Sequence, residues 1–276
     1  MYKIKRKEKL NSQVTLMEVY APYVAKKAEA GQFIILRVDD NGERIPLTIA
    51  DYDKENGTVT IIFQIVGATT MLLDRLNEGD FIKDFVGPLG KPTNTQDKKR
   101  VCIVGGGVGC AIAYPIAKKF HSQGSIVTTV VGFRNKDLVI LENEFKDVSD
   151  EFYLNTDDGS RGKKALVTET LEELIINGNH FDEVITIGPL IMMKYVCEVT
   201  KKYNIKTIVS MNPIMIDGTG MCGGCRLTVD GKMKFACVDG PEFDGFKVDF
   251  DEMILRNKSY KKHEEEACNL FKKEVM

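Results

Sequence analysis

The stretch VCIVGGGVG, residues 101–109, decides the fold of the second half of the chain. Its four apolar residues, 101–104, suit a short buried strand, and residues 111–121 have a helical pattern. Glycines between a strand and a helix allow a tight turn and let a pyrophosphate approach the helix N-terminus. The motif is not a strict Gly-x-Gly-x-x-Gly, and no Lys-Ser/Thr pair makes it a P-loop. A tight turn that binds nothing remains open for Gly105, Gly106, Gly107 and Gly109.

Strands and helices alternate downstream of this turn. Strand patterns lie at 126–131, 152–154, 183–187 and 207–211, with helical patterns at 142–145, 167–176 and 191–203. The alternation predicts a parallel sheet with helices on both faces. Two further loops follow predicted strands, and the carboxyl ends of parallel strands line one crevice. Three such loops predict a nucleotide site, and the added loop residues are Asp157, Asp158, Gly188 and Pro189.

The N-terminal part of the chain has a different pattern. β-rich runs at 32–38, 59–66 and, more weakly, 81–86 are separated by the turn signals DDNG and ENG. Closely spaced short strands predict a small antiparallel barrel with one short helix at 71–76. The expected fold class is thus β plus α/β. Its predicted parts are a barrel at 1–95, a nucleotide-binding domain at 96–211, a cysteine-rich subdomain at 212–250 and a helical tail at 251–276.

The composition is that of an ordinary soluble globular protein. The chain has 276 residues, of which 43% are apolar and 28% charged, and its formal net charge is −2. This balance argues against nucleic acid as a partner. No apolar run reaches the roughly 18–20 residues that cross a bilayer, and no apolar signal-peptide core follows the basic start. We therefore expect no membrane partner and a cytoplasmic location.

Three of the seven cysteines cluster after the segment that begins DGTGM at residue 217. The seven are too sparse for a disulfide framework, and three close thiolates in a reducing compartment usually hold a metal. Plant-type two-iron clusters use Cys-x4-Cys-x2-Cys and a more distant fourth Cys. An aspartate takes the first place here, and a carboxylate oxygen can bind ferric iron. The predicted [2Fe-2S] ligands are Asp217, Cys222, Cys225 and Cys237.

Two other interpretations of this cysteine cluster stay open, a structural zinc site and inert buried thiols. A structural zinc normally needs two paired knuckles or histidines, and no histidine lies near in the sequence. The four glycines between residues 218 and 224 let the backbone wrap closely, so that its NH groups can point at sulfides. These features favour iron and sulfide over zinc.

Two short motifs in the barrel region suit a diphosphate. The first is RIPLT at residues 44–48, whose arginine can bind phosphate oxygens in two places. The second is GATT at residues 67–70, which offers NH groups and hydroxyls to the same anion. Both motifs together indicate an anion site on the barrel.

The order of these motifs along nearly the whole chain resembles that of the ferredoxin–NADP reductase superfamily. The motifs are RIPLT (44–48), GATT (67–70), GPLG (87–90), GGGVG (105–109), TDDGS (156–160), GPLIM (188–192) and the C-terminal cysteines. The resemblance implies FAD on the barrel, NAD(P)H on the parallel-sheet domain and a cluster near the flavin, with no essential catalytic side chain. Many members have an aromatic residue where Leu47 stands, and Leu47 offers only apolar contact. By motif, FAD would be touched by Arg44, Pro46, Leu47 and Thr48, with Thr48 near the flavin ring, and its diphosphate held by Gly67, Thr69 and Thr70.

Within the superfamily, the chain is similar to two related families of electron-transfer subunits. One family serves dihydroorotate dehydrogenase and normally has four cysteine ligands. The other is the small subunit of NADH-dependent reduced ferredoxin:NADP oxidoreductases, which Asp217 matches. That likeness implies a larger flavin and iron–sulfur subunit as partner, and ferredoxin through the complex. A non-catalytic nucleotide-sensing or zinc-stabilised module remains the third hypothesis, and the choice between NADH and NADPH stays open, since Arg134 and Lys136 could meet a 2′-phosphate or solvent.

Overall fold

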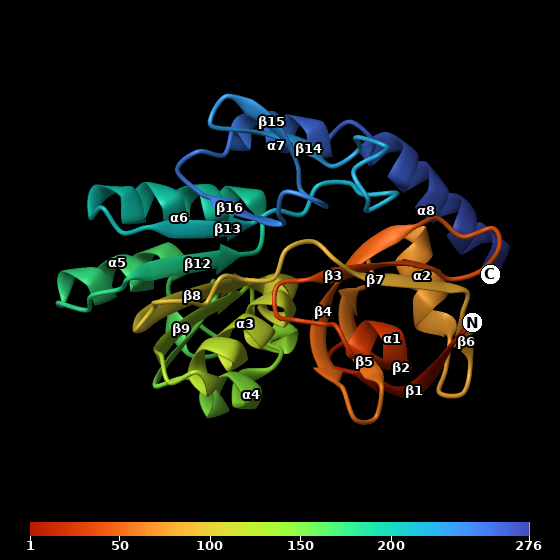
Figure 1. Ribbon diagram of the computed structural model, residues 1–276, viewed down its shortest axis with the longest axis horizontal. Helices are drawn as coiled ribbons and strands as arrows, with labels where there is room; N and C mark the ends of the chain where they lie inside the picture. Colours follow the sequence, from red (N-terminus) through yellow and green to blue (C-terminus); the bar gives the residue numbers. More distant parts are fainter. Residues whose placement is uncertain (276) are drawn as a thin grey trace.

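The computed structural model describes residues 1–275, with side-chain surroundings given through residue 271 (Figure 1). Its first part is a curled seven-stranded antiparallel sheet in the order β6-β1-β2-β5-β4-β3-β7. This half-barrel confirms the predicted barrel, and its buried side chains, such as Met17, Ile34 and Phe63, fill the inside of the curl. The elements are β1 (Tyr2–Lys9), β2 (Val14–Tyr20), α1 (Pro22–Ala25), β3 (Phe33–Arg37), β4 (Ile45–Asp53), β5 (Thr58–Gln64), α2 (Ala68–Arg75), β6 (Phe81–Ile82) and β7 (Asp84–Leu89).

The second part is a mostly parallel sheet in the order β11-β10-β9-β8-β12-β13-β16, which confirms the α/β prediction. Helices α3 and α4 cover one face and α5 and α6 the other (Figure 1). The central strands β8, β9 and β12 are buried on both faces, as their continuous apolar runs predict. The elements are β8 (Arg100–Gly106), α3 (Cys110–Ser122), β9 (Ile126–Phe133), α4 (Glu142–Asp147), β10 (Glu151–Thr156), β11 (Lys163–Lys164), α5 (Val167–Ile176), β12 (Glu183–Ile187), α6 (Leu190–Lys202) and β13 (Thr207–Ser210).

The cysteine-rich segment is tied to both larger parts. It contains the hairpin β14 (Arg226–Val229) and β15 (Lys232–Phe235). Its last strand, β16 (Glu242–Asp244), pairs antiparallel with β13 at the edge of the α/β sheet. A common core then joins this segment to β3 of the barrel, because Phe33 and Ile35 pack with Met215, Cys225 and Cys237.

The predicted helical tail is two helices, α7 (Phe250–Asn257) and α8 (Lys261–Val275). Helix α8 leaves the cysteine-rich segment and lies beside α2 of the barrel (Figure 1). There the Arg75 guanidinium stands 4.5 Å from the centre of the Phe271 ring. The predicted end of the tail, Met276, lies outside the described residues. No helix within residues 1–275 has the length and apolar character that a membrane span requires.

The half-barrel and the α/β sheet share a core, which holds the two walls of the site at a set separation. Ala50 and Ile62 of the barrel belong to the same buried cluster as Ile103 and Ile116 of the α/β domain. At the edge of this contact, Lys118 Nζ on α3 pairs with Asp51 Oδ2 on β4 at 2.7 Å. The ion pair is partly exposed, so its contribution is on the order of 1 kcal/mol or less, and the apolar contact dominates.

Candidate functional site

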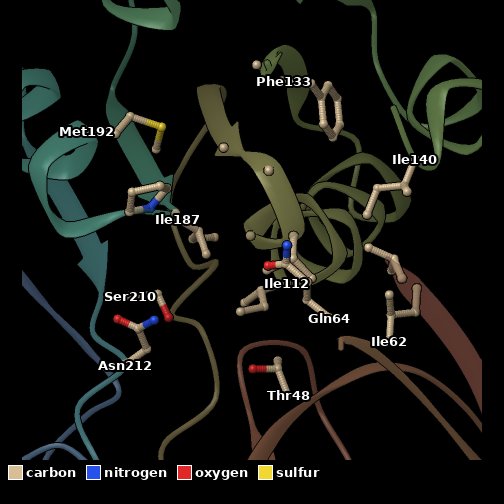
Figure 2. Close-up of a pocket in the computed structure, with 18 of the residues that line it drawn as sticks. Thr48, Ile62, Gln64, Ile112, Phe133, Ile140, Ile187, Met192, Ser210 and Asn212 are labelled. Atoms are coloured by element: carbon tan, nitrogen blue, oxygen red, sulfur yellow. The ribbon is translucent and has the colours of Figure 1, made fainter. Parts of the chain in front are cut away.

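A cavity of about 920 Å³ lies between the half-barrel and the carboxyl ends of the parallel strands (Figure 2). In Figure 2, Thr48, Ile62 and Gln64 line its barrel side, and Ile187, Ser210 and Asn212 line the opposite side. A cavity of this size, mostly apolar with a few polar groups, is typical of a small-molecule or cofactor site. The predicted site residues that line it are Pro46, Leu47, Thr48, Thr70, Gly106, Gly107, Gly109, Asp157, Gly188 and Pro189.

Five of the residues predicted to bind a nucleotide do not line this cavity. Arg44, Gly67 and Thr69 lie at its barrel end, beside the lining residues Ile45, Val66 and Thr70. Gly105 and Asp158 flank lining residues of the strand-end loops. The contacts of these five residues with a cofactor therefore stay predictions.

Glycine is required at two positions of the loop after β8 for two different physical reasons. A Cβ on Gly109 would lie 2.6 Å from the carbonyl oxygen of Ile187, so this glycine lets the loop pack against the end of β12. Gly107 has φ +55, and a Cβ there would meet nothing within 4 Å. The space beside Gly107 is open, as the approach of a pyrophosphate requires. The loop is therefore both a tight turn and an open cradle.

At the barrel end, α2 begins beside the cavity with its cap supplied by Thr70. The Thr70 hydroxyl accepts hydrogen bonds from the NH groups of Val66 (3.0 Å) and Gly67 (2.9 Å) and donates to the Gly67 carbonyl (2.9 Å). These bonds fix the turn that places the N-terminus of α2 beside the cavity. A Cβ on Gly67 would meet nothing within 4 Å, so the turn leaves room for an anion. Thr69 Oγ1 instead lies 3.4 Å from a Glu43 carboxylate oxygen.

The cysteine loop brings two thiols together and leaves the third at the surface. Cys225 and Cys237 are buried, and their sulfurs lie 3.1 Å apart. Backbone NH groups donate to two sulfurs, from Cys237 to Cys225 Sγ at 3.5 Å and from Gly224 to Cys222 Sγ at 3.4 Å. The Gly224 hydrogen bond lowers the pKa of the exposed Cys222 thiol. Three thiols with NH groups aimed at sulfur suit an iron–sulfur cluster.

Asp217 directs its carboxylate into its own loop. Oδ2 accepts from the NH groups of Thr219 (3.0 Å) and Met221 (3.2 Å) and from the Thr219 hydroxyl. The Thr219 hydroxyl, followed by its NH group, holds the pKa of Asp217 below its usual value. Within the part of the chain that the structure describes, no three His, Cys, Asp or Glu side chains are placed closely enough to hold a metal. The four-ligand set therefore stays a prediction that requires Asp217 and Cys222 to turn inward.

Several residues that line the cavity were not predicted from the sequence. Ile191, Met192 and Tyr195 come from α6, and Ser210 and Asn212 from the end of β13. The carboxyl-end rule for parallel strands could have identified the two residues after β13. Arg134 also lines the cavity, whereas the backbone NH of Lys136 donates to Ser160 Oγ at 2.7 Å.

The half-barrel, the parallel sheet and the cavity between them define a flavoprotein oxidoreductase of the ferredoxin–NADP reductase type. A family model described as the iron–sulfur cluster binding domain of dihydroorotate dehydrogenase B matches residues 212–249. The chain belongs to the family of dihydroorotate dehydrogenase B electron transfer subunits and their homologues. It is thus an electron-transfer protein that uses FAD, NAD(P)H and an iron–sulfur cluster.

Individual relatives cover most of the chain. A homologue of this electron transfer subunit from Thermotoga maritima is 46% identical over 98% of this chain and 95% of its own. The subunit from Streptococcus pneumoniae R6 is 36% identical over 78% of this chain and 84% of its own. A chain in the solved structure of an NADH-dependent reduced ferredoxin-NADP oxidoreductase, studied for flavin-based electron bifurcation, matches with a TM-score of 0.93 and 44% identity. That match covers 98% of both chains.

Proposed function

We propose that the chain is the small subunit of an NADH-dependent reduced ferredoxin:NADP oxidoreductase, in which it carries electrons between NADH, FAD and a [2Fe-2S] cluster. One observation carries the proposal: a single cavity joins Thr48 of the barrel to Gly107 and Gly188 of the strand-end loops. FAD held there would supply the chemistry that links the two-electron hydride of NADH to one-electron transfer to the cluster.

The chain's own groups supply binding and position. Arg44, next to the cavity, would bind two diphosphate oxygens, and the open turn at Gly67 would admit them. The NH-lined start of α2 adds favourable electrostatics for the same anion. On the opposite wall, the open space beside Gly107 would admit the pyrophosphate of the nicotinamide nucleotide.

The nucleotide end of the cavity favours NADH in this proposal. Asp157 lines the cavity at the end of β10, and a carboxylate there repels a 2′-phosphate but accepts from ribose hydroxyls. Arg134 lines the same wall and supplies the opposing positive charge. The balance between Asp157 and Arg134 decides the preference for NADH or NADPH. The NADH-dependent relative supports the interpretation in which Asp157 dominates.

A larger flavin and iron–sulfur subunit is the proposed partner, and ferredoxin would react through the complex. The relatives are described as electron transfer subunits, and such a subunit requires a second protein to serve. Exposed apolar side chains surround the cysteine loop, including Met221, which is 88% exposed, and Ile216 and Val238. An apolar surface beside an electron-carrying loop suits a lasting contact with that subunit.

Anaerobic mixing of the purified holoprotein with NADH and, separately, NADPH tests the function. We expect NADH to bleach the flavin absorbance and then to produce the electron paramagnetic resonance signal of a reduced two-iron cluster. NADPH should do so more slowly. A folded, colourless protein that binds neither flavin nor iron would refute the proposal.

The second candidate is the electron transfer subunit of a dihydroorotate dehydrogenase, which the Streptococcus relative and the matched family model favour. Co-purification from the native cell distinguishes the two candidates. A partner that reduces the flavin of this chain with dihydroorotate supports the second, and a partner that reduces it with NADPH or reduced ferredoxin supports the first.

A further inference from the structure

The loop that carries Asp217 is wedged between the barrel and its own subdomain by two glycines that face opposite ways. A Cβ on Gly218 would lie 2.7 Å from Leu89 Cδ1 and 2.9 Å from Ile35 Cγ1, both in the barrel. A Cβ on Gly220 would lie 2.8 Å from Val238 Cγ2, next to Cys237. The first glycine therefore sets how closely the loop approaches the barrel, and the second how closely it approaches the cysteines.

On the barrel side, this loop and the cavity lie against the same strand. Ile35 on β3 is only 2% exposed, and its register partner on β4 is Pro46, which lines the cavity. Phe33, two residues earlier, lines the cavity itself and pairs with Thr48. Side chains two residues apart on a strand share a face, so the proposed flavin site at Phe33 and Gly218 at Ile35 lie along the same face of β3.

We infer that Gly218 is a positioning residue that sets the distance between the iron–sulfur cluster and the flavin. The inference rests on the proposed function, since it places those two groups along the same face of β3. Each transfer would oxidise the reduced flavin by one electron and reduce one ferric iron to ferrous iron. The rate of such a transfer falls steeply with separation, and any side chain at Gly218 widens the gap.

Two physical features make glycine necessary at this position. The φ of Gly218 is +80, where an L-residue is strained. Leu89 is half-buried and could move aside, but Ile35 is packed on all sides within the core it shares with Cys225 and Cys237. The least costly response to an added methyl group is therefore a shift of the loop away from the barrel.

The test uses the holoprotein with Gly218→Ala and separates flavin reduction from cluster reduction. We expect bound iron and the rate of flavin bleaching by NADH to stay at wild-type levels. Rapid freeze-quench electron paramagnetic resonance should show the reduced-cluster signal appearing about tenfold more slowly, which lies within the roughly 100-fold that a misplacement of about 1 Å can cost in rate.

Gly231→Ala is the matched control for backbone strain. Gly231 has φ +68 in the β14–β15 turn of the same subdomain, and a Cβ there meets nothing within 4 Å. This variant should reduce its cluster at the wild-type rate. Gly220→Ala, in contrast, should lose iron, because it pushes the loop away from Cys237.

Each outcome decides the inference independently of the function. If wild-type protein reduces both groups but Gly218→Ala reduces its cluster equally fast, Gly218 does not set the distance, while the proposed function stands. If Gly218→Ala loses iron as Gly220→Ala does, the residue serves ligand folding and the inference is wrong. A wild-type protein without flavin or iron would instead remove the proposed function itself.

Discussion

The carboxylate of Asp217 accepts three hydrogen bonds from Thr219 and Met221, and all three go to Oδ2. Oδ1 accepts none of these three bonds and would be the oxygen available to iron. The three bonds favour the ionised form, which is the form that binds a metal. Sequence spacing identified this residue, but only the structure shows which oxygen is committed to the loop.

Replacing Asp217 tests whether it is a cluster ligand. A carboxylate binds iron less covalently than a thiolate, so Asp217→Cys should change the electron paramagnetic resonance signal and the reduction potential of the cluster. Asp217→Ala should leave one iron short of a protein ligand and lower the iron retained after gel filtration. Both are measured against Asp251→Ala, which removes an exposed carboxylate of α7 that pairs with Lys194. Wild-type spectra, potential and iron content in both Asp217 variants would show that the fourth ligand is another residue.

Thr70 illustrates what a sequence motif leaves undecided at the scale of one side chain. Its hydroxyl caps the turn before α2 through Val66 and Gly67. A threonine near a helix N-terminus suits either capping or binding an anion, so GATT predicts the place and not the partner. Its predicted contact with a diphosphate stays a prediction that the capping bonds must accommodate.

Among the elements, the strands of the α/β sheet were predicted closely, as were β3 and β5 of the barrel, whereas β1, β2 and β4 were not predicted. Strands β8, β9 and β12 are short apolar runs bounded by glycines or turns, so composition alone identifies them. Strand β4 is partly buried over most of its length and shows no alternation, because it lines the cavity on one side and meets α3 elsewhere. Strand β1 is mostly charged and exposed, so nothing in its composition predicts pairing.

At the scale of the elements, we expect the turn between β8 and α3 to determine how NADH binds. Gly107→Val should place a side chain in the open space of the turn and raise the KM for NADH by about tenfold or more, since a pyrophosphate must approach there. Steady-state reduction of an artificial dye acceptor by NADH measures it. Flavin content should stay unchanged.

Gly124→Val is the control for the strained backbone at this position. Gly124 follows α3, has φ +83, and a Cβ there meets nothing within 4 Å. Both variants pay a similar conformational cost of about 1–2 kcal/mol, but only Gly107 borders the cavity. An equal rise in KM for both variants would mean that the loop acts through stability and not through binding.

For the whole molecule, Glu242 joins all three parts of the fold. It stands on β16 and lies beside Gly31 of the barrel. Its carboxylate accepts a hydrogen bond of 2.5 Å from the hydroxyl of Thr93, which belongs to the linker between the two larger parts. The pKa of Glu242 is raised to about 7, mainly because the carboxyl is buried. The hydrogen bond from Thr93 lowers this pKa, and the negative charge of Glu183 raises it. The buried carboxyl is thus protonated in the folded protein under mildly acidic conditions in which the unfolded chain is already ionised.

This difference predicts how stability depends on pH. Between pH 4.5 and about 7 the folded state holds a proton that the unfolded state has lost, so the contribution of Glu242 to the free energy of unfolding falls as pH rises. The loss is at most about 3 kcal/mol and is complete above pH 7. Glu242→Gln should remove this slope and be more stable than wild type at pH 8, as measured by urea unfolding at several pH values. An unchanged slope would show that Glu242 ionises alike in both states.

Residues 211–241 leave the sheet after Ser210 and return at Glu242, and these two residues are register partners on adjacent strands. The whole iron-binding segment therefore starts and ends at neighbouring positions of the sheet, where β13 pairs with β16. Because the pairing of β13 with β16 already joins its two ends, the segment loses little further chain entropy on closing. Changes in the length of this segment should accordingly cost little stability, since each doubling of a closed loop costs only about 0.6 kcal/mol.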